Sequence, residues 1–93
     1  MAVRFEWDSQ KRAANVRKHG IGFEEATTVF GDTLSVTIAD PLHSDREDRS
    51  VIIGMSNRRR LLVVAFAERN TGIRIINARA ATARERTDYE EGT

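Results

Sequence analysis

The stretch VIIGMSNRRRLLVVAF, residues 51–66, is the most informative segment of this chain about its fold. Residues 51–55 and 61–66 are apolar at nearly every position, and a polar turn with three arginines separates them. Short apolar runs bounded by turn residues are typical of strands that are covered on both faces of a sheet. The stretch therefore predicts a hairpin of two central strands.

Two more strands are predicted beside this hairpin. Residues 34–38 alternate between apolar and polar side chains before Asp40-Pro41 breaks the pattern, and ERNTG at 68–72 turns the chain into a strand over residues 73–78. Such alternation between turn signals is typical of strands. Together with the hairpin, these segments predict a four-stranded antiparallel sheet.

The flanking segments predict helices and one short strand. Residues 3–7 alternate as a short strand, and helices are predicted from about residue 10 to His19 and over the apolar stripe at 23–30, which Gly31 ends. At the other end, TARE at 82–85 has the spacing of a capping box and begins a helix through Tyr89.

This order of elements predicts an α+β fold: a short N-terminal strand, two helices, then a four-stranded antiparallel sheet and a C-terminal helix. A chain of 93 residues supports one modest core, so residues 1–93 are expected to form a single domain. Two helices cover only one face of the sheet. The C-terminal helix or a partner chain is therefore expected to cover the other face.

The composition excludes several classes of protein. The chain has no cysteine, which excludes a disulfide framework and a thiolate metal site, and its two histidines, His19 and His43, lack the spacing of a metal ligand set. We therefore expect no metal and no cofactor. The opening MAVRFEWD has no apolar run typical of a signal peptide, and no later segment is long and apolar enough for a bilayer, so a cytoplasmic protein is expected.

The net charge is only +1, but the basic residues are unevenly placed. Residues 1–20 hold five basic and two acidic side chains, and residues 57–79 hold six arginines and one glutamate. Thirteen of the fifteen basic residues are arginine, whose planar guanidinium recognises phosphate bidentately. A phosphate-binding face and the codon bias of a GC-rich genome both explain this pattern.

The helix that ends at NVRKHG, residues 15–20, carries the first candidate site. Asp8 or Ser9 is expected to cap its start, and Gly20 to end it in the left-handed conformation. Ala13 and Val16 are expected to share one face of this helix. Lys11, Asn15 and Lys18 fall on the opposite face at spacings of four and three, so we expect the Asn15 amide to point outward among cations, where it could bind a partner.

Laid end to end, these elements resemble the BrnT family of bacterial type II toxins. The match is carried by FEWD at 5–8, Lys11, Asn15, KHG at 18–20, FEEA at 23–26, Ile53-Gly54, LLVV at 61–64, Ile75-Ile76, Ala78-Arg79, Ala81-Thr82, Glu85-Arg86 and Tyr89. The resemblance covers nearly the whole chain. Two departures are visible: Asn77 stands where the family usually has serine, and EDRSV at 47–51 lacks the aromatic residue that often follows the arginine, which leaves the role of Arg49 open.

The resemblance implies a fold like that of the RelE-type toxins and an endoribonuclease activity that blocks translation. It also implies a cognate BrnA-type antitoxin that neutralises the toxin. Toxin and antitoxin together are expected to bind their own promoter DNA, with the antitoxin supplying the DNA-binding domain. No membrane partner is expected, and a dimer or hetero-oligomer is consistent with the uncovered sheet face.

Metal-independent RNA cleavage needs a proton acceptor, a proton donor and cations that stabilise the charge on the reacting phosphate. His19 is the candidate acid or base, with Lys18 beside it, because histidine titrates near neutral pH. Its alternative role is that of a cation at a helix C-terminus. Arg79, after the last strand, is the candidate for phosphate binding, and an ion pair with Glu85 is its alternative.

The remaining candidates are predicted to bind RNA. Lys11 and Asn15 are assigned from the outward helix face, and Arg58, Arg59 and Arg60 from the hairpin turn. For at least two of these three arginines, a solvated turn that blunts the sheet is the stronger alternative. Trp7 is expected in the core rather than under a stacked base, and His43 is assigned no role.

Three functions compete on this evidence. The first is a ribonuclease toxin, which the joint presence of Lys18, His19 and Arg79 favours. The second is a non-catalytic toxin-like module that pairs with an antitoxin or with nucleic acid, and it needs the same basic face. The third is a structural sheet protein that dimerises through its uncovered face, which leaves the clustered arginines unexplained.

Overall fold

The computed structural model describes residues 3–39 and 49–92. Its elements, in chain order, are β1 (Phe5–Glu6), α1 (Ser9–His19), α2 (Phe23–Thr28), the 3₁₀ helix η1 (Val29–Gly31), β2 (Val36–Ala39), β3 (Arg49–Met55), β4 (Leu61–Arg69), β5 (Gly72–Ala80) and α3 (Ala83–Glu91). The α+β class and the order of helices and strands agree with the prediction. Arg79 lies inside the last strand rather than after it.

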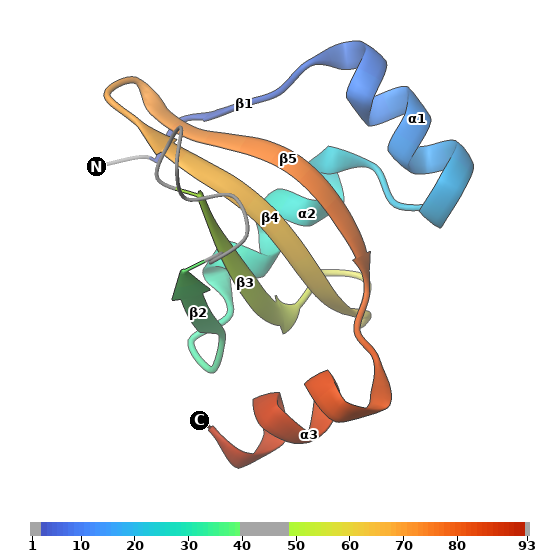
Figure 1. The fold of residues 1–93 in the computed structure, drawn as a ribbon, viewed down its shortest axis with the longest axis vertical. Helices are drawn as coiled ribbons and strands as arrows, with labels where there is room; N and C mark the ends of the chain where they lie inside the picture. The colour runs from blue at the N-terminus through green and yellow to red at the C-terminus, as the bar shows by residue number, and fades with distance from the viewer. Residues whose placement is uncertain (1–2, 40–48, 93) are drawn as a thin grey trace.

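The sheet has five strands in the order β1-β5-β4-β3-β2, and it is mixed rather than purely antiparallel (Figure 1). Strands β2 to β5 pair antiparallel, whereas β1 pairs parallel with β5 at Phe5–Ile73 and Glu6–Arg74. The prediction placed β1 outside the sheet. Parallel pairing needs a long crossover, and here the whole chain from α1 to β4 lies between the two strands, so no local signal in the sequence reveals it.

The larger core lies between one face of the sheet and the segment from Ile21 to η1. Its buried side chains come from α2, η1, one position of β3, alternate positions of β4 and two positions of β5, and β1 closes one end. Trp7 meets Phe23 edge to face, with ring centroids 6.2 Å apart, so its predicted place in the core is confirmed. Buried members include Ile21, Phe23, Val29, Leu62 and Ile75.

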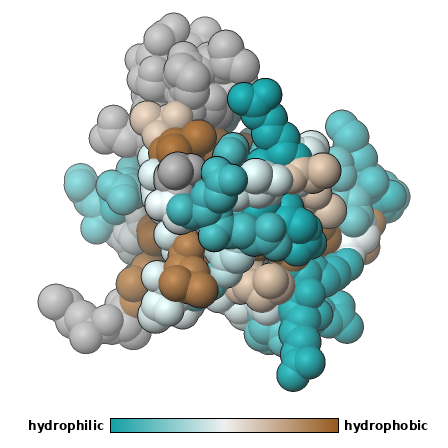
Figure 2. Space-filling view, turned by 90° about the horizontal axis from the view of Figure 1, so that it is seen from below, coloured by the Kyte–Doolittle hydropathy of each residue, from teal (hydrophilic) through white to brown (hydrophobic). Residues whose placement is uncertain are grey.

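A smaller apolar cluster lies on the other face of the sheet. Ile53, Leu61 and Val63 are buried there, and Tyr89 of α3 packs against them. Figure 1 shows α3 across the end of the sheet where β5 stops. Helix α3 thus covers part of the second face, and Figure 2, viewed from this end, shows hydrophobic surface between the hydrophilic side chains.

The helix predicted over residues 23–30 is instead α2 followed by the 3₁₀ helix η1. The predicted ends of α1 and the predicted start of α3 are confirmed by their capping geometry. Asp8 accepts hydrogen bonds from the backbone N–H groups of Gln10 (2.7 Å) and Lys11 (3.1 Å), and Gly20 ends α1 with φ of 72°. Thr82 and Glu85 form the full capping box of α3. These local signals are sufficient because the capping atoms lie within one turn of the helix.

The strand predicted at residues 34–38 begins two residues later. Asp32 accepts a hydrogen bond from the Leu34 N–H (2.9 Å) through its side chain and from the Ser35 N–H (3.0 Å) through its carbonyl. Because of these bonds, Leu34 and Ser35 belong to a turn, although the alternating pattern assigns them to the strand. Leu34 is consequently 69% exposed.

Candidate active site

A hollow of about 420 Å³ lies between α1 and the C-terminal half of β5. It is lined by Lys11, Ala14, Asn15, Lys18, His19, Ile76, Asn77 and Arg79. The structure therefore brings together all three residues predicted to be catalytic and two of those predicted to bind RNA. They come from opposite ends of the chain.

Helix α1 supplies most of the positive charge in this hollow. Lys11, Lys18 and His19 are exposed, and the last turn of α1 holds Arg17, Lys18 and His19, where the helix dipole favours cations. Gly20 stops the helix directly after His19. The imidazole thus stands at a fixed helix end, and Lys18, the preceding residue, lines the same hollow.

The prediction that Asn15 points outward is wrong. Asn15 is buried, 6% exposed, and both polar atoms of its side chain have protein partners. The Asn15 Nδ2 group donates to the carbonyls of Ile21 (2.9 Å) and Ala78 (2.9 Å), and Oδ1 accepts from the Ala78 N–H (3.1 Å). Asn15 therefore joins α1 to β5 and to the loop that follows α1.

The end of β1 explains why an amide is buried here. Strand β1 pairs with β5 only as far as Arg74, so the edge of β5 beyond that point needs another hydrogen-bonding partner. The Asn15 carboxamide gives Ala78 a donor and an acceptor, as a neighbouring strand would. The predicted assignment of the inward and outward faces of α1 is wrong for the same reason, since α1 turns Asn15 toward the sheet and leaves Val16 40% exposed.

Arg79 forms the ion pair that was its alternative role. Its Nη1 and Nη2 atoms donate to the two carboxylate oxygens of Glu85, both at 2.8 Å. The Arg79 guanidinium lowers the pKa of Glu85 to about 2, and hydrogen bonds from Thr82 act in the same direction. Glu85 thus fixes the Arg79 side chain at the rim of the hollow, and at neutral pH it neutralises part of its charge.

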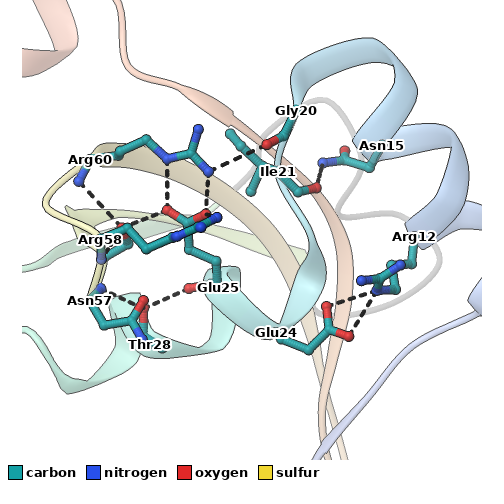
Figure 3. Close-up of polar contacts among 11 residues, drawn as sticks. Arg12, Asn15, Gly20, Ile21, Glu24, Glu25, Thr28, Asn57, Arg58 and Arg60 are labelled. Carbon is teal, nitrogen blue, oxygen red and sulfur yellow. Dashed lines mark hydrogen bonds and ion pairs between the residues drawn. The ribbon is translucent and has the colours of Figure 1, made fainter.

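A second hollow lies between α1, α2 and the β3–β4 turn, and Figure 3 shows several of the side chains around it. It is lined by Arg12, Val16, Gly20, Gly22, Glu24, Glu25, Asn57 and Arg58. Arg12 Nε donates to both carboxylate oxygens of Glu24, at 2.7 Å and 2.9 Å, so charges of both signs face this hollow. Arg58 therefore lies apart from the hollow that contains Arg79.

The three arginines of the β3–β4 turn differ in their surroundings. Arg60 pairs with the buried Glu25 and donates from Nη2 to the Gly20 carbonyl (3.3 Å), which ties the turn to the end of α1 (Figure 3). Arg60, with help from the Ser56 hydroxyl, holds the pKa of Glu25 below its usual range. Arg58 has a 72% exposed side chain 3.9 Å from Glu25, and Arg59 is exposed with φ of 62°.

Asn77 is the residue of the hollow that sequence reasoning noted but gave no role. Its exposure and its neighbours depend on an irregularity in β5, for which the sequence carries no signal. His43 lies outside the described residues. Within residues 3–39 and 49–92, no group of three or more His, Cys, Asp or Glu side chains is placed to hold a metal ion, and no helix is long and apolar enough to cross a membrane.

Two comparisons with known proteins find relatives. Residues 7–85 match the model of a family described as the ribonuclease toxin BrnT of type II toxin–antitoxin systems. The fold resembles the crystal structure of the Brucella abortus ribonuclease toxin BrnT, with a TM-score of 0.68 and 23% identity over 87% of this chain and 99% of that one. A search of curated proteins finds no match.

The family match spans most of the chain, including α1, the hairpin, β5 and the start of α3. The structural likeness adds that the fold is shared. The residues that line the first hollow thus fall within the matched region. This chain belongs to the BrnT family of ribonuclease toxins of type II toxin–antitoxin systems.

Proposed function

We propose that this toxin is a metal-independent endoribonuclease whose active site is the hollow between α1 and β5. The proposal rests on one observation: His19 lines the same cavity as Lys11, Lys18 and Arg79. A proton-transfer group and several cations are what cleavage of RNA by its own 2′-hydroxyl requires.

In this reaction the 2′-oxygen attacks the neighbouring phosphorus and gives up its proton. The bond from phosphorus to the 5′-oxygen breaks, and the leaving oxygen gains a proton, which yields a 2′,3′-cyclic phosphate and a 5′-hydroxyl. His19 acts as the proton-transfer group, because its imidazole is exposed at the rim. Lys11, Lys18 and Arg79 stabilise the charge that develops on the phosphoryl oxygens.

The cellular role follows from the family. We infer that cleavage blocks translation, that a BrnA-type antitoxin neutralises the toxin, and that the pair binds promoter DNA through the antitoxin. A cytoplasmic site of action fits an RNA substrate. We also infer that the fold is related to that of the RelE-type toxins, and the α+β order of elements supports this relationship.

Cleavage of RNA by purified, antitoxin-free protein in the presence of EDTA tests the proposal. His19→Ala should lower the cleavage rate by about 10²–10⁴-fold, the usual contribution of a general acid or base. His43→Ala should leave it unchanged. Lys18→Ala should lower the rate, whereas Arg17→Ala, which removes a cation from the same helical turn but outside the hollow, should have little effect.

Circular dichroism must show that each variant is folded. Full activity of His19→Ala would overturn the assigned role of the histidine. Absence of cleavage by the wild-type protein, combined with intact antitoxin binding, would instead favour the non-catalytic alternative.

A further inference from the structure

We propose that Asn77 determines the sequence specificity of cleavage by hydrogen-bonding to the edge of a nucleobase next to the reacting phosphate. This inference rests on the proposed ribonuclease function and concerns the same hollow. It assigns a task to a residue that the proton-transfer chemistry does not use. The case begins with the backbone of β5.

Strand β5 contains a β-bulge at Ile76. Ala65 of β4 pairs with Asn77 and its neighbour Phe66 pairs with Ile75, so Ile76 is an extra residue in the ladder. Burial shows the same irregularity, because Ile75 and Ala78 are both buried although they are three positions apart. In a regular strand, residues three apart point to opposite faces.

The bulge is what turns Asn77 away from the core. Without it, Asn77 would share the face of the buried Ile75. With it, Asn77 and Arg79 share the other face, where they lie opposite Ala65 and Val63 of β4, and both line the hollow. Bulges commonly re-aim a side chain next to an active site.

The Asn77 carboxamide is available to a ligand. The side chain is exposed, and no hydrogen bond from it to another described residue is present. Asn15, whose side chain bonds to the neighbouring Ala78 of β5, shows the contrast, since its Nδ2 and Oδ1 atoms are both engaged with backbone groups. Asn77 is therefore not required to hold the fold together.

The chemistry of an amide among cations points to base recognition. Lys11, Lys18 and Arg79 attract any phosphate whatever the sequence, and such contacts fix position rather than specificity. A carboxamide carries donors and an acceptor side by side, which match the paired groups on a base edge better than an all-acceptor phosphate. In single-stranded RNA these edges are accessible, so proteins read them directly.

The test compares wild type, Asn77→Ala and Asn77→Ser on an RNA pool with random sequence, with cleavage sites mapped by sequencing the new ends. Asn77→Ala should still cleave RNA. Its preference for one base at one position beside the cut should fall by about tenfold, in line with the discrimination of a paired amide–base contact. Asn77→Ser, which has one short hydroxyl in place of the carboxamide, should lose part of this base preference. Asn70→Ala, an exposed asparagine at the β4–β5 turn, should keep the wild-type pattern.

An unchanged pattern in Asn77→Ala would overturn the inference, and so would an equal loss of cleavage at all sequences, which indicates contact with the RNA backbone. Binding of fluorescent RNA homopolymers of the four bases, made uncleavable by 2′-O-methylation, gives an independent reading. The wild type should bind the four homopolymers with different affinities, whereas Asn77→Ala should bind all four with similar affinity. If the wild type cleaves no RNA, the proposed function fails, and the binding comparison still decides the role of Asn77.

Discussion

At the scale of single residues, Asn15 is the polar side chain that α1 buries against the sheet. It satisfies the N–H and carbonyl of Ala78 and the carbonyl of Ile21 in a buried place. Each buried group left without a partner costs about 1–3 kcal/mol. Asn15→Leu, similar in size and unable to form these bonds, should therefore lower the free energy of unfolding by about 3 kcal/mol or more.

Urea unfolding measures this loss. Asn77→Ala, the same residue type on β5 but exposed, should change stability by no more than about 0.5 kcal/mol. A small effect in Asn15→Leu would mean that water or a shift of α1 replaces the amide. If the helix does shift, cleavage should fall as well, because Lys18 and His19 move with it.

Glu85 is the second residue whose contacts give a prediction. Its pKa is lowered to about 2 from a model-compound value of 4.5, since the folded state favours the charged carboxylate beside Arg79. The resulting stability is complete above pH 4.5 and is lost as pH falls through about 2. Glu85→Gln should flatten the dependence of unfolding free energy on pH in this window, whereas Glu90→Gln on the exposed side of α3 should preserve it.

The same substitution tests how Arg79 is used. Glu85 occupies both terminal nitrogens of the guanidinium, so a phosphate competes with it. Glu85→Gln should bind RNA more tightly than the wild type in fluorescence anisotropy. Weaker binding would indicate that Glu85 chiefly orients Arg79 and that the ion pair persists in the complex.

At the scale of elements, α3 is held to the sheet by a hydrogen bond near its C-terminal end. The Tyr89 hydroxyl donates to Asp32 Oδ2 (2.6 Å), and the same oxygen accepts from the Met55 N–H (2.7 Å). The hydrogen bond to Asp32 raises the pKa of Tyr89 to about 12. The neutral phenol is thus favoured by folding, and its contribution to stability is present below pH 10 and lost as pH rises from 10 to about 12.

Tyr89→Phe should abolish this alkaline dependence and cost about 1 kcal/mol at neutral pH, because the ring still packs while the bond is lost. Denaturant unfolding between pH 8 and 12 measures both effects. Thr87→Val, on the same helix and away from Asp32, serves as the control. A variant with the wild-type alkaline profile would show that another group titrates there.

The elements themselves differ in how well the sequence predicts them. Asp8, Gly20 and Thr82 act on backbone groups within one turn, so the ends of α1 and the start of α3 follow from local spacing. Contacts between distant segments determine the pairing of β1 with β5 and the bulge at Ile76. The periodicity of apolar residues in the sequence therefore indicates neither feature. The inward orientation of Asn15 is not predictable for the same reason, because its partner Ala78 lies far along the chain.

At the scale of the whole molecule, the hollow collects cations from the first helix and the last strand. Lys11, Lys18 and Arg79 together should contact about three phosphates, so the logarithm of RNA affinity should fall with the logarithm of salt concentration with a slope near −2 for single strands. Lys18→Ala should reduce the magnitude of this slope by about 0.7. A slope near zero in the wild type would remove the phosphate-binding role of the hollow.

The second face of the sheet gives the last prediction, which concerns assembly. Helix α3 covers only part of it, and among the described residues Leu34 and Ile38 near the β2 edge are 69% and 55% exposed. Type II toxins act with an antitoxin partner, and a partner that binds only the folded toxin stabilises it by mass action. At a concentration 100 times its dissociation constant, the antitoxin should add about 2.7 kcal/mol to the stability of the toxin.

Thermal unfolding over a series of antitoxin concentrations measures this gain in stability. Analytical ultracentrifugation of the toxin alone shows whether it dimerises, as expected if a second copy covers the same face. Because the gain grows with the logarithm of antitoxin concentration, the melting temperature should keep rising after the complex is saturated. A monomeric toxin whose melting temperature ignores the antitoxin would mean that α3 alone suffices to protect the second face. The apolar strands of the central hairpin would then be explained within one chain.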